Sequence, residues 1–515
     1  MTMTQPGEQN TVLRLDHITK TFGSLIANND ISLHLRRGEI LGLLGENGAG
    51  KTTLMNILFG HYVADGGSIF VEGKPLTPGE PKAALAAGVG MVHQHFTLAE
   101  NLTVLDNIVL GTQSLWAFRS ATDKVRDRLK KLATDYGLKI DLDATVASLS
   151  VGEKQRVEII KALYRNATIL ILDEPTAVLT PNESTALFDT LKLFVAKGLS
   201  IIFISHKLGE IMATCNRVAI LRSGSLVATR DITLVSRGEL AELMVGRQVT
   251  QPKASSQAAG RQVLSLSKVS ASRNQNRIEK IDLEVRQGEI VGIAGVSGNG
   301  QSLLADIVSG VLTPKSGTIT LNEKILASNS PRQMVAKGVA RIPEDRQAEG
   351  LIGDMSVAEN VISETYRSAK FMRKGFINWK AARHFAEKII ADYGVKCSST
   401  EAQVRLLSGG NMQKLILGRV MEGQPSLILA NQPTRGLDVG AVAHVHEQLL
   451  MARKRGAGII LISEDLDELL ALSDRVAVMY QGRLSALFKQ GEFTIRKLGL
   501  MMAGQDVTEG QVDAA

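Results

Sequence analysis

The sequence predicts an α/β fold that is built twice along the chain. Equivalent segments recur at a nearly constant spacing, since Gly45 and Gly295 stand 250 residues apart and Ser150 and Ser408 stand 258 apart. Each copy alternates short apolar runs, typical of parallel strands covered on both faces, with stretches of helical periodicity. A Gln-, Ala- and Ser-rich stretch between the copies is typical of a linker. The predicted division is domain 1 at residues 11–247, a linker at 248–262, domain 2 at 263–505 and a C-terminal tail at 506–515.

Composition narrows the class of protein. Of 515 residues, 44% are hydrophobic and 22% are charged, as in ordinary globular chains. No apolar run approaches the roughly 20 residues that cross a bilayer, so we expect no membrane helix, and the N-terminus does not resemble a signal peptide. Cys215 and Cys397 lie too far apart to indicate a disulfide framework, which favours the cytoplasm. The net charge of +7 includes no run of five or more Lys and Arg, so we expect no nucleic-acid partner.

The elements of domain 1 can be predicted in order. Residues 39–44 are expected to form a buried strand that feeds a glycine-rich loop, and residues 53–58 to lie in the helix that follows. The region 102–149 is mostly helical in pattern, with polar turns. Residues 169–172 and 200–204 are short apolar runs expected to form further parallel strands. We therefore expect an α/β core with an inserted helical subdomain.

The glycine-rich loop indicates phosphate binding. Gly45-Glu-Asn-Gly-Ala-Gly-Lys-Thr52 fits the pattern G-x-x-x-x-G-K-[ST], between a strand and a helix as such loops require. Glycines let backbone N–H groups surround the β-phosphate, Lys51 reaches the β and γ oxygens, and the Thr52 hydroxyl binds Mg²⁺. The residues expected to bind ATP here are Gly45, Glu46, Asn47, Gly48, Ala49, Gly50, Lys51, Thr52 and Thr53.

Two adjacent carboxylates end the strand predicted at residues 169–172. Asp173 is expected to bind Mg²⁺, and Glu174 to polarise the attacking water as the catalytic base. Acidic residues at a strand end also serve as loop caps. The phosphate loop in the same domain favours the catalytic interpretation.

The string Leu149-Ser-Val-Gly-Glu-Lys-Gln155 closely resembles the signature of the ATP-binding cassette (ABC) ATPases, and Leu407-Ser-Gly-Gly-Asn-Met-Gln413 matches it in domain 2. The resemblance covers essentially the whole chain except the tails and the linker. It implies two tandem P-loop NTPase domains, each with a RecA-like α/β core, a β subdomain and an inserted helical subdomain. It also implies three further site residues: Gln94 as the catalytic and Mg²⁺-binding Q-loop residue, His206 as the catalytic switch histidine at the γ-phosphate, and Phe22 as the aromatic that stacks on adenine.

Domain 2 departs from domain 1 at five of these positions. The aligned pairs are Lys51 and Gln301, Gln94 and Glu344, Asp173 and Asn431, Glu174 and Gln432, and His206 and Glu464. With histidine neutral, the five groups carry a formal charge of −1 in domain 1 and −2 in domain 2. A nucleotide with Mg²⁺ would therefore meet more negative charge and no lysine in domain 2. We expect hydrolysis in domain 1 only, and leave open whether domain 2 binds ATP.

In ABC proteins two cassettes meet head to tail, and each nucleotide lies between one phosphate loop and the opposite signature. The resemblance therefore implies that Ser408, Gly409, Gly410 and Asp438 of domain 2 serve the intact loop of domain 1. Domain 1 itself offers weaker parts, because Val151 replaces a signature glycine. The better parts thus belong to one nucleotide site, which indicates one working ATPase site and one structural or regulatory site.

Three classes of ABC protein fit a tandem chain. A DNA-repair ATPase would carry zinc-binding cysteines, and two isolated cysteines argue against it. A ribosome-associated ABC-F protein resembles the chain in its duplication, but such proteins have a long charged helical linker and usually keep both catalytic glutamates. The linker here is short and one glutamate is replaced by Gln432. The energy-coupling ATPase of a transporter is therefore favoured.

Within transporters, fused cassettes with a degenerate second half resemble the import ATPases for simple sugars and nucleosides. The strings that carry this resemblance are Pro343-Glu-Asp-Arg346, Met355-Ser-Val-Ala-Glu-Asn360 and Gln432-Pro-Thr-Arg-Gly-Leu-Asp-Val-Gly440. The amides at 431 and 432, together with His93-Gln-His-Phe96, favour nucleosides over monosaccharides, and both remain open. The implied partners are two transmembrane permease subunits and a solute-binding protein or lipoprotein. One such chain per transporter would lie peripherally on the cytoplasmic face of a bacterial inner membrane.

Overall fold

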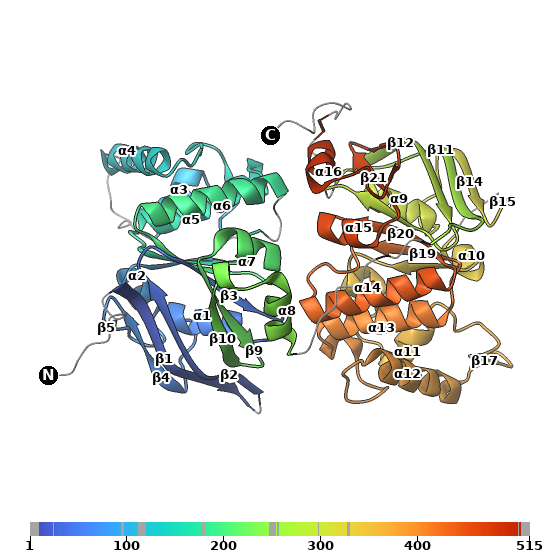
Figure 1. The fold of residues 1–515 in the computed structure, drawn as a ribbon, viewed down its shortest axis with the longest axis horizontal. Coiled ribbons are helices and arrows are strands. Elements are labelled where there is room, and N and C mark those ends of the chain that lie inside the picture. Colours follow the sequence, from blue (N-terminus) through green and yellow to red (C-terminus); the bar gives the residue numbers. More distant parts are fainter. Residues whose placement is uncertain are drawn as a thin grey trace. The chain divides into compact units, whose positions relative to one another are not determined.

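The computed structural model describes residues 10–23, 25–93, 97–111, 120–176, 179, 181–246, 254, 257–274, 276–296, 298–326, 330–502 and 504–505. The chain divides into two compact units, Met1–Val249 and Thr250–Ala515, called unit 1 and unit 2 below. Unit 1 runs from blue to green in Figure 1 and unit 2 from yellow-green to red. Within the described ranges, no helix is both long and apolar enough to cross a bilayer.

Unit 1 contains a six-stranded mixed sheet and a four-stranded antiparallel sheet. In spatial order, the six strands are β10 (Ser225–Asp231), β9 (Arg217–Arg222), β3 (Ile40–Gly45), β8 (Ser200–Ile204), β7 (Ile169–Asp173) and β6 (Val89–Val92). The four antiparallel strands are β2 (Leu25–Arg36), β1 (Thr11–Phe22), β4 (Gly66–Val71) and β5 (Lys74–Pro75). Strands β3, β7 and β8 are buried along their full length, which explains their continuous apolar sequences.

The helices of unit 1 are α1 (Lys51–Phe59), α2 (Pro81–Ala86), α3 (Val104–Val109), α4 (Ser120–Asp135), η2 (Val146–Ser148), α5 (Val151–Tyr164), α6 (Pro181–Ala196), α7 (Leu208–Thr214), η3 (Ile232–Leu234) and α8 (Arg237–Val245). Helix α1 shares one apolar core with β1, β2 and β3, so it lies between the two sheets. Helix α5 begins with a capping box in which Ser150 and Glu153 satisfy each other's backbone N–H groups. The predicted helical subdomain is confirmed by α3 and α4.

Unit 2 repeats this architecture (Figure 1). Its mixed sheet has the order β16 (Val339–Ile342), β19 (Leu427–Asn431), β20 (Gly458–Ser463), β13 (Ile290–Ala294), β21 (Arg475–Tyr480) and β22 (Arg483–Leu484), and β23 (Phe488–Lys489) also pairs with β21. Its antiparallel sheet has the order β12 (Asn276–Arg286), β11 (Gln262–Arg273), β14 (Ser316–Leu321) and β15 (Lys324–Ile325). A separate hairpin pairs β17 (Met372–Arg373) with β18 (Phe376–Ile377).

The helices of unit 2 are α9 (Gln301–Val308), α10 (Pro331–Ala336), the π-helix η4 (Arg346–Gly350), α11 (Val357–Ile362), α12 (Trp379–Tyr393), η5 (Val404–Leu406), α13 (Gly409–Glu422), α14 (Val439–Lys454), α15 (Leu466–Leu472) and α16 (Ile495–Met502). Helix α9 shares a core with the antiparallel sheet and β13, as α1 does in unit 1. A second core contains residues of α11 to α16 together with the mixed sheet. The α/β fold of two tandem cassettes, each with a β subdomain and a helical subdomain, is therefore confirmed.

The linker prediction needs a small correction at its end. Gln262, assigned to the linker from the sequence, is the first residue of β11. Before it, Gly260 donates its backbone N–H to Gln287 O over 2.8 Å, and Ala254 donates to Ala471 O over 3.0 Å. Polar composition did not reveal these contacts because they are made by backbone groups. The described end of the linker thus already belongs to unit 2.

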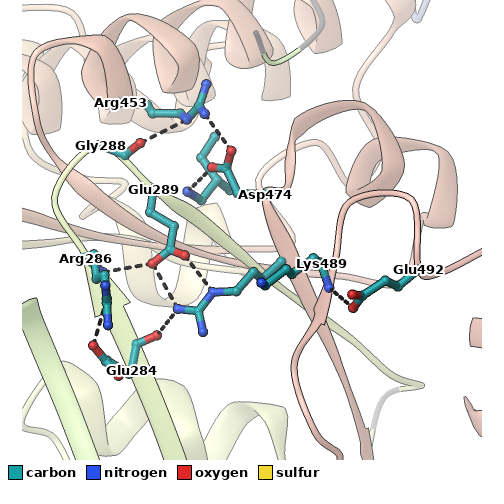
Figure 2. A network of polar contacts seen from close by, with 10 residues as sticks. Glu284, Arg286, Gly288, Glu289, Arg453, Asp474, Lys489 and Glu492 are labelled. Carbon is teal, nitrogen blue, oxygen red and sulfur yellow. Dashed lines mark hydrogen bonds and ion pairs between the residues drawn. The ribbon is translucent and has the colours of Figure 1, made fainter. Parts of the chain in front are cut away.

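Buried ion pairs hold the beginning of the central strand in unit 2 (Figure 2). The carboxylate of Glu289 accepts from Arg475 Nε over 2.6 Å and Nη2 over 3.0 Å. Asp474 accepts from the Ile290 backbone N–H over 2.8 Å and forms a 2.5 Å ion pair with Arg453. Because these groups come from β13, β21 and α14, the network ties three elements together at the end of β13 that is remote from its glycine-rich loop.

Candidate functional site

The phosphate loop of unit 1 connects β3 to α1 and requires glycine at its two ends. Gly50 has a φ of +97°, and a Cβ there would lie 2.3 Å from Ala27 O. A Cβ on Gly45 would lie 2.4 Å from Leu221 O. The Asn28 amide donates to Gly50 O over 3.1 Å and so fixes the turn into α1. The loop can pass this close to its neighbours only without side chains at these positions. It leads directly into the N-terminus of α1, the arrangement that favours phosphate binding.

Lys51, the first residue of α1, is buried and bends back across the loop. Its ammonium donates to Gly45 O over 2.7 Å and to Glu46 O over 2.9 Å. These carbonyls hold the charge over the loop, in the place where the loop pattern predicts phosphate oxygens. Thr52 and Thr53 follow in the first turn of α1, with Thr52 exposed.

The strand order brings the other predicted catalytic groups to the same edge. Strands β3, β8 and β7 are parallel neighbours, so the loop after β3, the end of β7 and the residues after β8 share one side of the sheet. Asp173 is the last residue of β7, and Glu174 follows it with a φ of +47°. Glu174 Oε1 lies 2.8 Å from His206 Nδ1. The predicted base and the predicted switch histidine are therefore hydrogen-bonded to each other.

Burial and neighbouring charges shift the pKa values of the two carboxylates in opposite directions. Burial, helped by the charge of Glu174, raises the pKa of Asp173 to about 6, and Lys51 opposes this shift. Burial also raises the pKa of Glu174, but the hydrogen bond and charge of His206, with Lys51, outweigh it and leave that pKa below its ordinary value. Glu174 is therefore ionised and can accept a proton. Asp173 and the Thr52 hydroxyl offer oxygen donors, the ligands that Mg²⁺ prefers, so the donor set fits that ion.

A second layer of residues, not predicted from the sequence, positions these groups. Gln155 of α5 donates to Pro175 O over 2.8 Å. Glu210 accepts from Thr176 Oγ1 over 2.6 Å and from Ser205 Oγ over 2.7 Å, and so joins the loop after β7 to the loop after β8. The duplication held a signal for them, because the same residue types recur 258 residues later in unit 2, where two of the three bonds are repeated.

The repeated bonds in unit 2 use the same residue types. Gln413 donates to Pro433 O over 2.7 Å, and Ser463 donates to Glu468 over 2.6 Å. Two of the three supporting bonds are thus kept in unit 2, and Glu468 also contacts His446 Nε2 over 3.0 Å.

The predicted adenine-stacking residue, Phe22, is 43% exposed at the end of β1. Its ring meets Tyr62 edge to face, with centroids 5.5 Å apart, and Lys20 Nζ lies 5.4 Å from the ring centroid. Tyr62 was missed from the sequence because it lies 40 residues away in a turn after α1. An exposed aromatic pair of this kind provides a platform for a flat base, and its role stays a prediction.

The remaining predicted site residues belong to unit 2 or fall outside the described part of the chain. Gln94 falls outside the described residues. In unit 2, Ser408 is the N-cap of α13 and its Oγ accepts from the Asn411 amide over 2.8 Å, with Gly409 and Gly410 in the first turn. Asp438 caps α14 by accepting from the Ala441 N–H over 2.8 Å. That these four residues bind the nucleotide of unit 1 stays a prediction from the resemblance.

Unit 2 keeps the shape of the site without its reactive groups. Gln301 is buried and donates to Val296 O over 2.9 Å, the carbonyl that matches Glu46 O in unit 1. Gln432 has a φ of +49°, like Glu174, and its Oε1 accepts from the Glu464 N–H over 3.3 Å. An amide has no basic carboxylate to offer water, which supports the prediction that unit 2 does not hydrolyse ATP.

Arg435 adds an ion pair that the comparison of charge made from the sequence did not include. Its guanidinium forms an ion pair with Glu344, and Arg346 donates to Arg435 O. The +1 charge of Arg435 brings the −2 of the five groups in unit 2 to −1, the value in unit 1, where Ala177 stands at the matching position. Arg435 thus offsets the charge of Glu344 within unit 2. The two sites also differ in the lysine of the loop and in the base, which unit 2 lacks.

The fold and the site together define a P-loop ATPase with two tandem cassettes. The chain belongs to the ABC transporter family, whose sequence profile matches residues 28–177 and 278–435. It is accordingly an ATP-binding protein of the ATPase class.

Full-length relatives are import ATP-binding proteins. The chain is 44% identical to the glucose import ATP-binding protein TsgD13 of Haloferax volcanii, over 96% of each chain. It is 40% identical to the nucleoside import ATP-binding protein NupA of Lactococcus lactis (97% of this chain, 99% of that one) and 43% identical to the guanosine import ATP-binding protein NupO of Bacillus subtilis (97% and 98%). Among solved structures, archaeal ribosome recycling factor aABCE1 matches with a TM-score of 0.64 over 95% of this chain and 92% of that one, at 17% identity. That likeness concerns the fold alone.

Proposed function

We propose that the chain is the energy-coupling ATPase of an importer for nucleosides, and that unit 1 alone hydrolyses ATP. Glu174 takes the proton of the attacking water, His206 holds Glu174 in place, and Lys51 stabilises the charge on the phosphate oxygens. Thr52, Asp173 and Gln94 would hold Mg²⁺, which would neutralise phosphate charge when bound. The signature residues Ser408, Gly409 and Gly410, together with Asp438, are proposed to bind the same ATP.

The observation that carries the proposal is the 2.8 Å contact between Glu174 and His206 in unit 1. Its counterpart in unit 2 joins the amide of Gln432 to a backbone N–H of Glu464. A base can act only in the first arrangement. Unit 2 then serves as a structural or regulatory partner.

The ATPase part is tested on the purified chain by phosphate release from Lys51→Ala and from Gln301→Ala. We expect Lys51→Ala to lose hydrolysis and Gln301→Ala to keep most of it. Equal losses in the two variants would contradict the asymmetric assignment.

The cargo is assigned to nucleosides because NupA and NupO are nucleoside and guanosine import proteins and match nearly the whole chain. The amides Asn431 and Gln432, which favoured the nucleoside branch from the sequence, point the same way. Simple sugars are the second candidate, favoured by the 44% identity to a glucose import protein. No ribosomal role is proposed, because the ribosome-associated match is at fold level only.

The cargo is tested by uptake in cells that lack the gene for this chain and in cells that carry it back. Labelled guanosine and labelled glucose are compared, each with excess unlabelled ribose, glucose or adenosine as competitor. Restored uptake of guanosine that only nucleosides inhibit supports the proposal. Restored uptake of glucose alone would assign the chain to sugars instead. In either case the proposed partners are two permease subunits and a solute-binding protein, with this chain bound peripherally at the cytoplasmic membrane surface.

A further inference from the structure

We propose that the segment 366–383 of unit 2, called the basic hairpin here, binds the surface of an anionic lipid bilayer. It comprises the β17–β18 hairpin and the first turn of α12. The proposal goes beyond the proposed function, which places the chain at a membrane only through permease subunits.

The basic hairpin is strongly cationic. Between Glu364 and Glu387 the chain has no acidic residue. The cations in this span are Arg367, Lys370, Arg373, Lys374, Lys380 and Arg383. Among the described residues only Arg383 has a carboxylate partner, Glu401, at 2.8 Å.

Three of these cations are exposed and available. Arg373, Lys374 and Lys380 are exposed and form no ion pair with any described residue. Polybasic surface segments of this kind are attracted to anionic lipid headgroups, and each Lys or Arg near the surface adds about a five-fold gain in binding. These three cations thus provide an electrostatic attraction that no ion pair within the described part of unit 2 neutralises.

Two large aromatic side chains protrude among the cations. Phe376 is 79% exposed and Trp379 is 40% exposed. Phe376 pairs with Arg373 across the hairpin, so an apolar ring and a cation project from the same short ladder. Aromatic rings beside cations are typical of segments that lie in the headgroup region of a membrane, between the apolar acyl chains and water.

The hairpin is held rigidly enough to display these groups. Lys374 and Gly375 have φ values of +51° and +84°, the signs required by a tight two-residue turn. Behind the turn, Phe371 is buried and its ring lies 5.3 Å from that of Phe385 in α12. The Asn378 N–H donates to Phe371 O over 2.8 Å and so closes the base of the hairpin.

The duplication also sets this segment apart. Asn107 and Asn360 are 253 residues apart, whereas Ser150 and Ser408 are 258 apart, so unit 2 has five additional residues in between. The β17–β18 hairpin lies in this interval. We assign the occupant as lipid rather than protein because the apolar groups stand on a projecting turn among unpaired cations. A flat anionic surface matches that arrangement of charge.

The test uses the purified full chain and sedimentation with vesicles of phosphatidylcholine, with or without phosphatidylglycerol. We expect binding to the anionic vesicles only, and weakening by salt. Arg373→Gln with Lys374→Gln should lower the partition coefficient about thirty-fold, from two charges at about five-fold each. The matched control is Lys130→Gln with Lys131→Gln on the exposed face of α4 in unit 1, which removes the same charge and should change binding little.

A second readout follows Trp379 directly. The chain has two tryptophans, so Trp116→Phe leaves Trp379 as the only indole. Its emission should shift to shorter wavelength on anionic vesicles, and Phe376→Ala should weaken that binding.

Failure of the chain to bind anionic vesicles would overturn the proposal, as would equal losses in the hairpin and control variants. Loss of permease binding in detergent by the hairpin variant, without any vesicle binding by the parent chain, would assign the surface to a protein and also overturn it. The hairpin variant should keep the ATPase rate of the parent, which separates this outcome from failure of the proposed function.

Discussion

Replacement of Glu174 by glutamine isolates the chemistry of unit 1 from its folding. The protein already contains glutamine in this conformation, because Gln432 has a φ of +49° where Glu174 has +47°. The backbone N–H groups also match: Glu174 donates to Ile204 O over 3.0 Å and Gln432 donates to Ile462 O over 2.8 Å. The new amide oxygen can still accept from His206, so the local geometry is retained. We expect the melting temperature to change by no more than a few degrees, since a typical substitution that keeps the local geometry costs about 1 kcal/mol.

The loss of transition-state stabilisation in this variant should be larger than its loss of folding stability. A positioned general base contributes about 10²- to 10⁴-fold, so kcat should drop by that factor, or about 3 to 5 kcal/mol of transition-state stabilisation. Phosphate release measured at saturating ATP and Mg²⁺ gives kcat, and equilibrium binding of labelled ATP shows whether the loop still holds nucleotide. We expect binding to persist.

Gln432→Ala is the matched control in unit 2 and should leave kcat within about three-fold of the parent. Gln432→Glu should add no second activity, because Gln301 and Asn431 still replace the lysine and the aspartate. A Glu174→Gln variant that retains more than a tenth of the parent kcat would refute the assignment of Glu174 as the base. Equal losses from Glu174→Gln and Gln432→Ala would refute the asymmetry.

Three further outcomes can be measured. Arg475→Ala should destabilise unit 2 by about 3 to 5 kcal/mol in urea unfolding, because Glu289 would be left buried without its partner. The control, Arg277→Ala, breaks an exposed pair and should cost no more than about 1 kcal/mol. Gly50→Ala should abolish ATP binding and lower the melting temperature, because its Cβ would meet Ala27 O at 2.3 Å. In the control, Gly48→Ala, the Cβ meets no atom within 4 Å, so both effects should be smaller. Chelation of Mg²⁺ should stop phosphate release from the parent, and added Mg²⁺ should restore it; release that continues in excess chelator would contradict the proposed metal ligands.

Much of the fold could be predicted because the decisive signals are local or repeated. The apolar runs at 169–172 and 200–204 became the fully buried strands β7 and β8. The duplication predicted two cassettes, and parallel strand order then brings Glu174 and His206 together although they are 32 residues apart. Lys51 lies over its loop as the phosphate-loop pattern predicts.

Other features depend on contacts that no local pattern contains. Arg435 meets Glu344 across 91 residues, so a sum over the aligned site positions did not include this ion pair. Tyr62 meets Phe22 through the path of a turn rather than through spacing. The β17–β18 hairpin has only two residues in each strand, too short for an alternation of apolar and polar residues to show.

Gln301 shows that the lysine of a phosphate loop has two separable jobs. One is structural, since a side-chain nitrogen donates to the inner carbonyls of the loop. An uncharged amide can do this too, with a single hydrogen bond to Val296 O. The other is to attract phosphate, which requires the positive charge. A duplicated cassette can therefore lose its reactive lysine and still keep the internal bond from this position to the loop. Returning lysine to position 301 would restore only the attraction.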